Sequence, residues 1–117
     1  MEYAYDKSAN RLIVHVDGST TPQERLPIWK RAFEISGWKP GGTICGIARA
    51  NTIVADLESL NELIKLASKH KVKKAAFTIK EKDSLTMSQE GLKLISHYNI
   101  PTKLFTDLQE MFDWINE

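Results

Sequence analysis

Cysteine is almost absent from this sequence, since Cys45 is the only one among 117 residues. An internal disulfide therefore cannot form, and paired cysteines are what small secreted domains commonly rely on. Long hydrophobic runs are missing as well, and residues 1–6 contain no basic segment followed by an apolar one. We expect neither a membrane span nor a secretory signal, and we interpret the chain as cytoplasmic.

An excess of charge of one sign is also missing. The chain has 16 basic and 15 acidic residues, which gives a net charge of +1. Nucleic-acid binders usually carry a strongly basic balance, so we expect no nucleic-acid partner. The 42% hydrophobic and 26% charged residues are ordinary for a folded globule. We expect one domain over residues 1–117, a length that buries roughly two-thirds of the unfolded surface.

Recognisable catalytic and cofactor motifs are absent too. No serine lies in a nucleophile-elbow pattern, and Gly41-Gly42 precedes an expected strand rather than the helix that a phosphate-binding loop requires. Cys45 lies between Ile44 and Ile47 in a predicted strand, where a buried structural role is expected. The three histidines share no metal-ligand spacing with each other or with Cys45; they are His15, His70 and His97. We expect no enzymatic activity, no metal and no cofactor.

The sequence does contain a regular series of strand and helix patterns. Residues 2–6 and 11–17 predict a β-hairpin, in which Leu12, Val14 and Val16 share one face. Thr21, Pro22 and Glu24 form a helix-start signature, although Pro27 predicts a kink or a later start.

The remaining elements alternate between strand and helix. Residues 42–48 are apolar on both faces, as in a central strand, and a helix is predicted from Asp56 to His70. A strand at 74–80, a helix at 86–98 and a strand at 102–105 follow, and Thr106 with Gln109 predicts the cap of a last helix. The predicted fold class is α/β with the order ββαβαβαβα, an N-terminal hairpin followed by a mostly parallel mixed sheet.

Two stretches resemble a known family. Residues 103–115 contain a closing strand, a Phe-Thr-Asp-Leu turn and a helix ending in Trp-Ile, and residues 3–21 contain a matching hairpin, Gly18 and Thr21. Together with the order of elements, they resemble the small bacterial STAS-like (SpoIIAA-like) domains, which are related to anti-sigma-factor antagonists. The resemblance covers nearly the whole chain. It implies a STAS-like fold and a non-catalytic regulatory or protein-binding role.

In regulatory members of that family, a serine in an Asp-Ser-Ser-Gly turn is phosphorylated to switch partner binding. The matching stretch here is Ala55-Asp56-Leu57-Glu58-Ser59, which keeps the Asp but lacks the Ser pair and the Gly. Ser59 is the remaining candidate for phosphorylation. The carboxylates of Asp56 and Glu58 would repel an added phosphate, and the helix dipole offsets this only in part.

Polar and basic residues follow the predicted parallel strands at their carboxyl ends, where ligands gather in open α/β sheets. Cations beside helix N-termini favour an anion or a phosphate-bearing ligand. The candidate anion site consists of Arg49, Thr52, Lys80, Lys82, Ser84 and Thr106. The alternative is that the lysines are solvated loop charges and that Thr106 only caps a helix.

Three functional hypotheses remain. The leading one is a regulatory domain that binds a protein partner, and the second is a carrier of a small apolar or anionic ligand in a pocket beside Trp29 and Phe33. The third is an enzyme of unrecognised type, which requires Cys45, His15 or Asp56 exposed beside a second ionisable group. Self-association is a further expectation, because the hairpin leaves an unpaired edge and a sheet face that carries Ile13 and His15.

Overall fold

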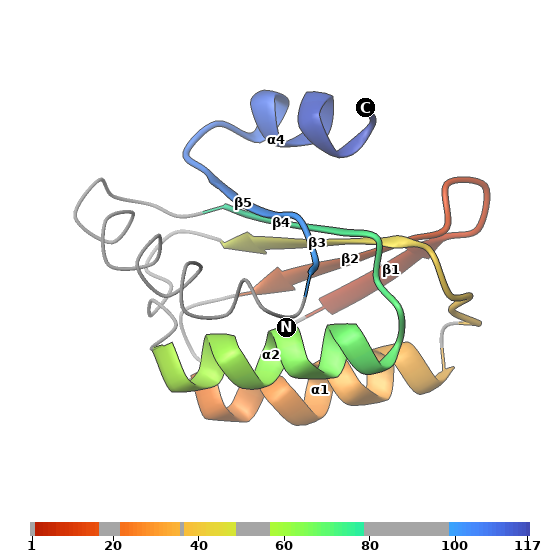
Figure 1. Cartoon of the computed structure of the whole chain (residues 1–117), viewed down its shortest axis with the longest axis vertical. Helices are drawn as coiled ribbons and strands as arrows, with labels where there is room; N and C mark the ends of the chain where they lie inside the picture. Colours follow the sequence, from red (N-terminus) through yellow and green to blue (C-terminus); the bar gives the residue numbers. More distant parts are fainter. Residues whose placement is uncertain (1, 17–21, 36, 49–56, 79–98) are drawn as a thin grey trace.

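The chain opens with a hairpin in which β1 (Glu2–Asp6) pairs antiparallel with β2 (Arg11–Val16). The Asp6 carboxylate fixes the turn, since it accepts hydrogen bonds from the Ser8 N–H at 3.0 Å and the Ser8 hydroxyl at 2.7 Å. The turn ends at Asn10, with a φ of 50° that asparagine tolerates. The computed structural model describes residues 2–16, 22–35, 37–48, 57–78 and 99–117 (Figure 1).

Three further strands continue the sheet in parallel. They are β3 (Thr43–Ala48), β4 (Lys74–Thr78) and β5 (Thr102–Phe105), and the order across the sheet is β1-β2-β3-β4-β5. The predicted central position of β3 is confirmed, because it lies between β2 and β4. Its neighbouring residues Ile44 and Cys45 point to opposite faces, and both have 0% exposure.

Helices cover both faces of this sheet. Figure 1 shows α1 (Pro22–Ile35) and α2 (Leu57–Lys69) side by side on one face and α4 (Leu108–Ile115) on the other. The described residues thus form an α/β domain with a mixed five-stranded sheet and three helices, as the predicted fold class requires. The helix predicted at 86–98 lies outside the described residues. None of the helices in the described ranges has the length and apolarity needed to cross a bilayer.

The larger core lies between the sheet and the α1–α2 layer. Leu12, Val14 and Val16 are all buried there, so the predicted inward face of β2 is confirmed. Trp29 of α1 is 2% exposed and contacts the Phe77 ring edge to face, with 6.5 Å between the ring centroids. Aromatic packing of this kind holds α1 close to β3 and β4.

Two details of the helix starts differ from prediction. The later start predicted for the first helix is wrong, because α1 runs from Pro22 and contains Pro27 within it. A proline this close to the N-terminal end interrupts few backbone hydrogen bonds. The predicted cap at Thr106 is also wrong: Asp107 is the N-cap of α4, and its carboxylate accepts from the Glu110 N–H at 3.1 Å.

Candidate functional site

The carboxyl ends of the four parallel strands lie at one edge of the sheet, at Val16, Ala48, Thr78 and Phe105. This arrangement is the one on which the predicted anion site depends. Arg49, Thr52, Lys80, Lys82 and Ser84 fall outside the described residues. Thr106 is exposed and directly follows β5. The anion site therefore remains a sequence prediction with one described member.

Ser59 lies in the first turn of α2, which begins at Leu57. Its side chain is outside the described set, and so are Ala55 and Asp56. Ser59 thus lies within the helix that the sequence predicts from Asp56 to His70. Phosphorylation at this position stays a prediction.

A buried arginine near the same edge was not predicted from the sequence. Arg25 is 9% exposed and is the fourth residue of α1. It precedes the core residue Trp29 by four positions and the core residue Phe33 by eight. The spacing of 25, 29 and 33 in a helix was the available signal, because positions four apart share one face. A guanidinium is costly to bury unless it is compensated, which makes Arg25 an unusual member of the buried side of α1.

The thiol of Cys45 is unsuited to nucleophilic chemistry in this fold. It has 0% exposure and belongs to the core cluster beneath α4. Burial raises the pKa of Cys45 to about 11, and the nearby Arg11 guanidinium lowers it only slightly in return. The thiol is therefore protonated at neutral pH, whereas catalysis requires the thiolate.

Two of the three histidines are described, and they lie in different places. His15 is half-buried on the α4 side of the sheet, whereas His70 stacks on Phe33 with 4.4 Å between the ring centroids. His97 lies outside the described residues. Within the described ranges, no three His, Cys, Asp or Glu residues come together in a way that would hold a metal ion.

Among the described elements, α4 covers mainly one part of its face of the sheet. α4 packs chiefly on β4 and β5, and its buried Met111 and Ile115 complete a cluster with Cys45, Ala76 and Phe105. Ile13 of β2 and Ile47 of β3 pack against this cluster but are only half-buried. The side chains of β1, β2 and β3 on this face are the strongest candidate for a binding site among the described residues.

This area of β1, β2 and β3 is mostly apolar, and strand pairing defines its members. Ile13 pairs with Ala4 and His15 pairs with Ile47, so the four side chains lie on one face of neighbouring strands. Ala4 is exposed, and the other three are half-buried. We call Ala4, Ile13, His15 and Ile47 the open sheet face. The sequence predicts Ile13 and His15 on such a face, whereas Ala4 and Ile47 are assigned to it by the strand register.

The apolar space predicted for a small ligand is filled by side chains. Trp29 and Phe33 are 2% and 3% exposed, and a Cβ at Gly46 would come within 2.6 Å of the Phe77 ring and 3.6 Å of the Trp29 ring. Dense aromatic packing therefore occupies the position between α1 and the sheet where the carrier hypothesis requires a pocket.

The two remaining tryptophans have structural contacts. Trp38 donates from Nε1 to the His70 carbonyl at 2.9 Å and packs edge to face on Phe33. Trp114 is half-buried, and its ring lies under the Lys74 ammonium at 4.8 Å from the centroid. Both rings therefore secure elements of the fold, which accounts for them without a partner surface.

Comparison with known proteins returned nothing: neither a family model, nor a curated protein, nor a solved structure matches the chain.

Proposed function

We propose that this chain is a non-catalytic STAS-like regulatory domain that acts by binding a protein partner through the open sheet face. The sequence resemblance suggests the family, and the five-stranded mixed sheet with an N-terminal hairpin is compatible with it. The observation that carries the proposal is the apolar area of β1–β3 beside α4. Ile13 and Ile47 pack against the cluster beneath α4 but are only half-buried, and among the described residues α4 packs chiefly on β4 and β5. The apolar surface that they leave exposed favours association with another apolar surface.

The chemistry of the described residues supports a binding role over a catalytic one. The Cys45 thiol is buried with a raised pKa, and His15 lies between isoleucines on the open sheet face. The half-buried isoleucines supply apolar contact area, and the His15 imidazole supplies a polar group beside them, a combination that is common at protein interfaces. The filled space around Trp29 counts against the carrier hypothesis.

Two variants test the proposal. Ile13→Thr with Ile47→Thr keeps β-branched residues in both strands but removes apolar surface from the open sheet face. Tyr3→Thr is the matched control, because Tyr3 is 40% exposed and pairs with Val14, which places it on the opposite face of the sheet. Wild type and both variants are isolated from the protein's own cells and compared by native mass spectrometry.

The expected result is a stoichiometric protein partner on wild type and on Tyr3→Thr that is lost from the double variant. A photo-crosslinking amino acid at position 13, compared with one at position 3, locates the contact. A partner held equally by all three proteins would overturn the open sheet face as the site. A bare chain in every sample, or a small molecule seen only under native conditions, would overturn the protein-binding role.

A further inference from the structure

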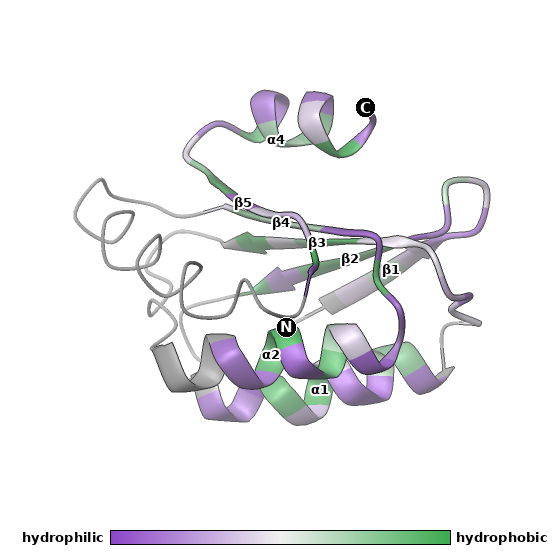
Figure 2. Cartoon of the chain, viewed as in Figure 1, coloured by the Kyte–Doolittle hydropathy of each residue, from purple (hydrophilic) through white to green (hydrophobic). Residues whose placement is uncertain are grey.

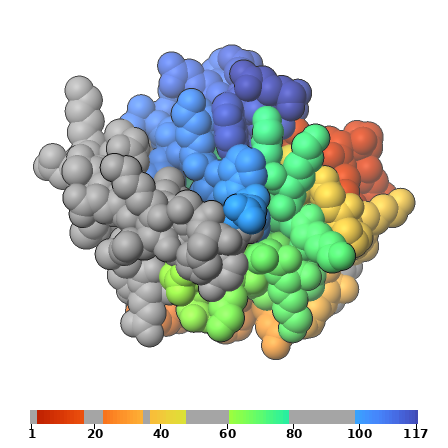
Figure 3. Space-filling view, viewed as in Figure 1, coloured from red at the N-terminus to blue at the C-terminus, as the bar shows by residue number. Residues whose placement is uncertain are grey.

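Three loops meet at the amino ends of the parallel strands. The Gly41 N–H donates to the Lys71 carbonyl at 2.8 Å, and the Lys73 N–H donates to the Gly42 carbonyl at 2.7 Å. The Asn10 side chain joins the hairpin turn to this pair, since its Nδ2 donates to the Lys39 carbonyl at 2.9 Å. Figure 3 shows these segments meeting on one side of the molecule. The residues around these contacts include five lysines, Lys7, Lys39, Lys69, Lys71 and Lys73, which we call the basic end.

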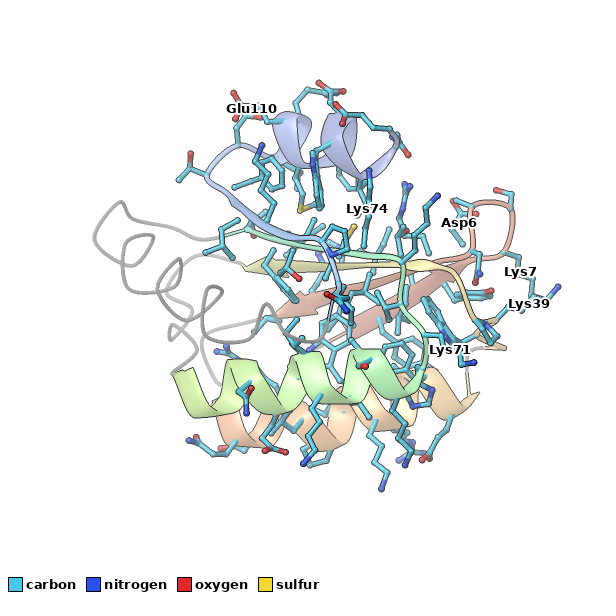
Figure 4. All side chains as sticks on the ribbon, in the orientation of Figure 1. Asp6, Lys7, Lys39, Lys71, Lys74 and Glu110 are labelled. Atoms are coloured by element: carbon cyan, nitrogen blue, oxygen red, sulfur yellow. The ribbon has the colours of Figure 1, made fainter. Side chains whose placement is uncertain are left out.

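The basic end is a concentrated positive surface. All five lysines are exposed, and Figure 4 shows Lys7, Lys39 and Lys71 on the same side of the molecule. Residues 7–10, 37–42 and 69–73 contain no Asp or Glu, and the nearby carboxylate that acts on His70 is the exposed Glu34 near the end of α1. The neighbouring Asp6 carboxylate is engaged within its own turn, where it accepts from Ser8. Five like charges gathered at one end of the molecule favour an anionic partner.

A matching negative surface lies on α4. Asp107, Glu110, Asp113 and Glu117 are all exposed. Glu110 and Asp113 lie three residues apart in α4 and so on one side of it, Asp107 is its N-cap, and Glu117 follows the C-cap residue Asn116. Met111 and Ile115 occupy the other side and face the sheet; Figure 2 shows the resulting alternation of polar and apolar segments. Residues 104–117 contain no Lys, Arg or His. We call the four carboxylates the acidic side of α4.

The two charged surfaces come nearest each other at the last turn of α4, whereas Glu110 lies towards the other end of the helix (Figure 4). The Arg11 guanidinium donates to the Asn116 Oδ1 at 2.7 Å, and the Lys74 ammonium donates to the Glu117 carbonyl at 3.3 Å. Both contacts hold the last turn of α4 over the amino ends of β2 and β4, the same end at which the lysines gather. When two copies are related by a two-fold axis, the positive patch of each copy can contact the negative patch of the other. Both contacts then form in one interface, and the assembly closes at a dimer.

We propose that two copies of this chain associate through these surfaces, the basic end of each copy on the acidic side of α4 of the other. This contact is separate from the open sheet face. It therefore goes beyond the proposed function and stands or falls independently of it.

Charge complementarity selects a second copy over a nucleic acid. Asp113 and Glu117, at the end of α4 nearest the lysines, repel a phosphate backbone, and the net charge is only +1. The indole ring within these loops, Trp38, packs on Phe33 and is not presented for base stacking. The acidic side of α4 is the complementary surface that the protein itself supplies.

Ion pairs at an exposed surface are individually weak and strongly screened by salt. We therefore expect a weak dimer at low ionic strength whose apparent Kd rises at least about tenfold between roughly 0.02 M and 0.3 M NaCl. Sedimentation velocity of the full chain at neutral pH measures this directly.

Charge reversal identifies the surfaces. The first variant, Lys39→Glu with Lys73→Glu, spares Lys71, whose φ is 57°, and Lys69, which lies at the end of α2. The second variant, Asp113→Lys with Glu117→Lys, places cations near the carboxyl end of α4, where the helix dipole favours them. Each variant alone is expected to be monomeric at low salt. Their equimolar mixture is expected to restore the dimer, because one supplies two acidic surfaces and the other two basic ones.

Circular dichroism melting confirms that both variants fold. A wild type that is monomeric at low salt, a dimer insensitive to salt, or a mixture that stays monomeric would each overturn the proposal. Binding of a fluorescent single-stranded oligonucleotide by a monomeric wild type, with loss in the lysine variant, would assign the basic end to a polyanion instead. Ile13→Thr with Ile47→Thr is expected to leave the dimer intact, which separates this result from the proposed function.

Discussion

The ammonium of Lys74 contacts both the backbone and the side chain of Trp114. Its Nζ donates to the Trp114 carbonyl at 3.1 Å and lies 4.8 Å from the centroid of the indole ring. α4 contains no basic residue in its last turn, so this lysine from β4 supplies the cation that the negative end of the helix dipole favours. The contact links the sheet to the end of the helix that covers Cys45.

Lys74→Met is therefore expected to lower the free energy of unfolding by about 1–2 kcal/mol, since it removes a charge-assisted hydrogen bond and a cation–π contact while keeping the alkyl stem. Urea unfolding followed by tryptophan fluorescence measures the change. Lys103→Met is the control, because Lys103 is exposed and lies over the Phe105 ring at a longer 5.4 Å. Its expected change is within about 0.5 kcal/mol. Equal losses in both variants would contradict the assigned role of Lys74.

Two glycines are expected to differ sharply in their tolerance of alanine. A Cβ at Gly46 would lie 2.6 Å from the Phe77 ring, which is itself packed on Trp29. Gly46→Ala is expected to cost about 1–3 kcal/mol, because a filled core has to shift to admit a methyl group. At Gly42 the Cβ would lie 2.3 Å from the backbone oxygen of Asn10, which moves less easily than a ring. Gly42→Ala is therefore expected to be the more damaging change in the same urea measurement.

Gly41→Ala is the control for these substitutions. No atom lies within 4 Å of a Cβ at this position, but its φ is 91°. The expected loss is about 1–2 kcal/mol and arises from backbone strain alone. A smaller loss at Gly42 than at Gly41 would contradict the close approach of the two loops.

Cys45 is expected to be unreactive in the folded protein. Its thiol is buried beneath α4 with a pKa of about 11, so both access and thiolate formation are restricted at pH 8. Alkylation by iodoacetamide, followed by mass spectrometry, is expected to be at least about 100-fold slower in native protein than in urea. Lys74→Met is expected to accelerate the native reaction, because weaker docking of α4 exposes the thiol more often. Fast modification of wild type would contradict the burial of Cys45.

The periodicity of the sequence predicted most of the described elements. Alternation placed Leu12, Val14 and Val16 on one buried face, and the doubly apolar stretch around Cys45 identified the central strand. The predicted stripe of the second helix also holds where it is described, since Leu63, Ile64 and Ala67 are buried. These successes share a cause: a repeat of two or of 3.6 residues depends only on which side of an element faces the core.

Features that depend on how segments meet were predicted only in part. The sequence predicts Ile13 and His15 on the open sheet face, but Ala4 and Ile47 join it only through the pairing of Ala4 with Ile13 and of His15 with Ile47. The helical spacing of Arg25 from Trp29 indicates its burial, whereas capping of α4 by Asp107 rather than Thr106 depends on local geometry that residue preferences do not fix. The basic end likewise arises only when three loops separated in sequence are hydrogen-bonded together.

His70 gives the fold an expected pH dependence. Burial against Phe33 and the charge of Lys69 lower the pKa of His70 below 6.5, and Glu34 raises it only in part. Since the unfolded chain binds the proton more readily, the contribution of neutral His70 to stability is complete above pH 6.5. It is lost as the pH falls from there through the folded pKa.

His70→Phe is expected to flatten this dependence. The variant keeps a ring that can stack on Phe33, and the backbone carbonyl that accepts from Trp38 is unchanged. Urea unfolding at pH 5, 6, 7 and 8 compares the slopes of stability against pH, which are steeper for the protein with the titrating group. A slope as steep in the variant as in wild type would assign the acid sensitivity to another group. A shallower slope with unchanged stability at pH 8 would show that apolar contact holds the ring on Phe33. The pH dependence would then come from the lowered pKa of His70 alone.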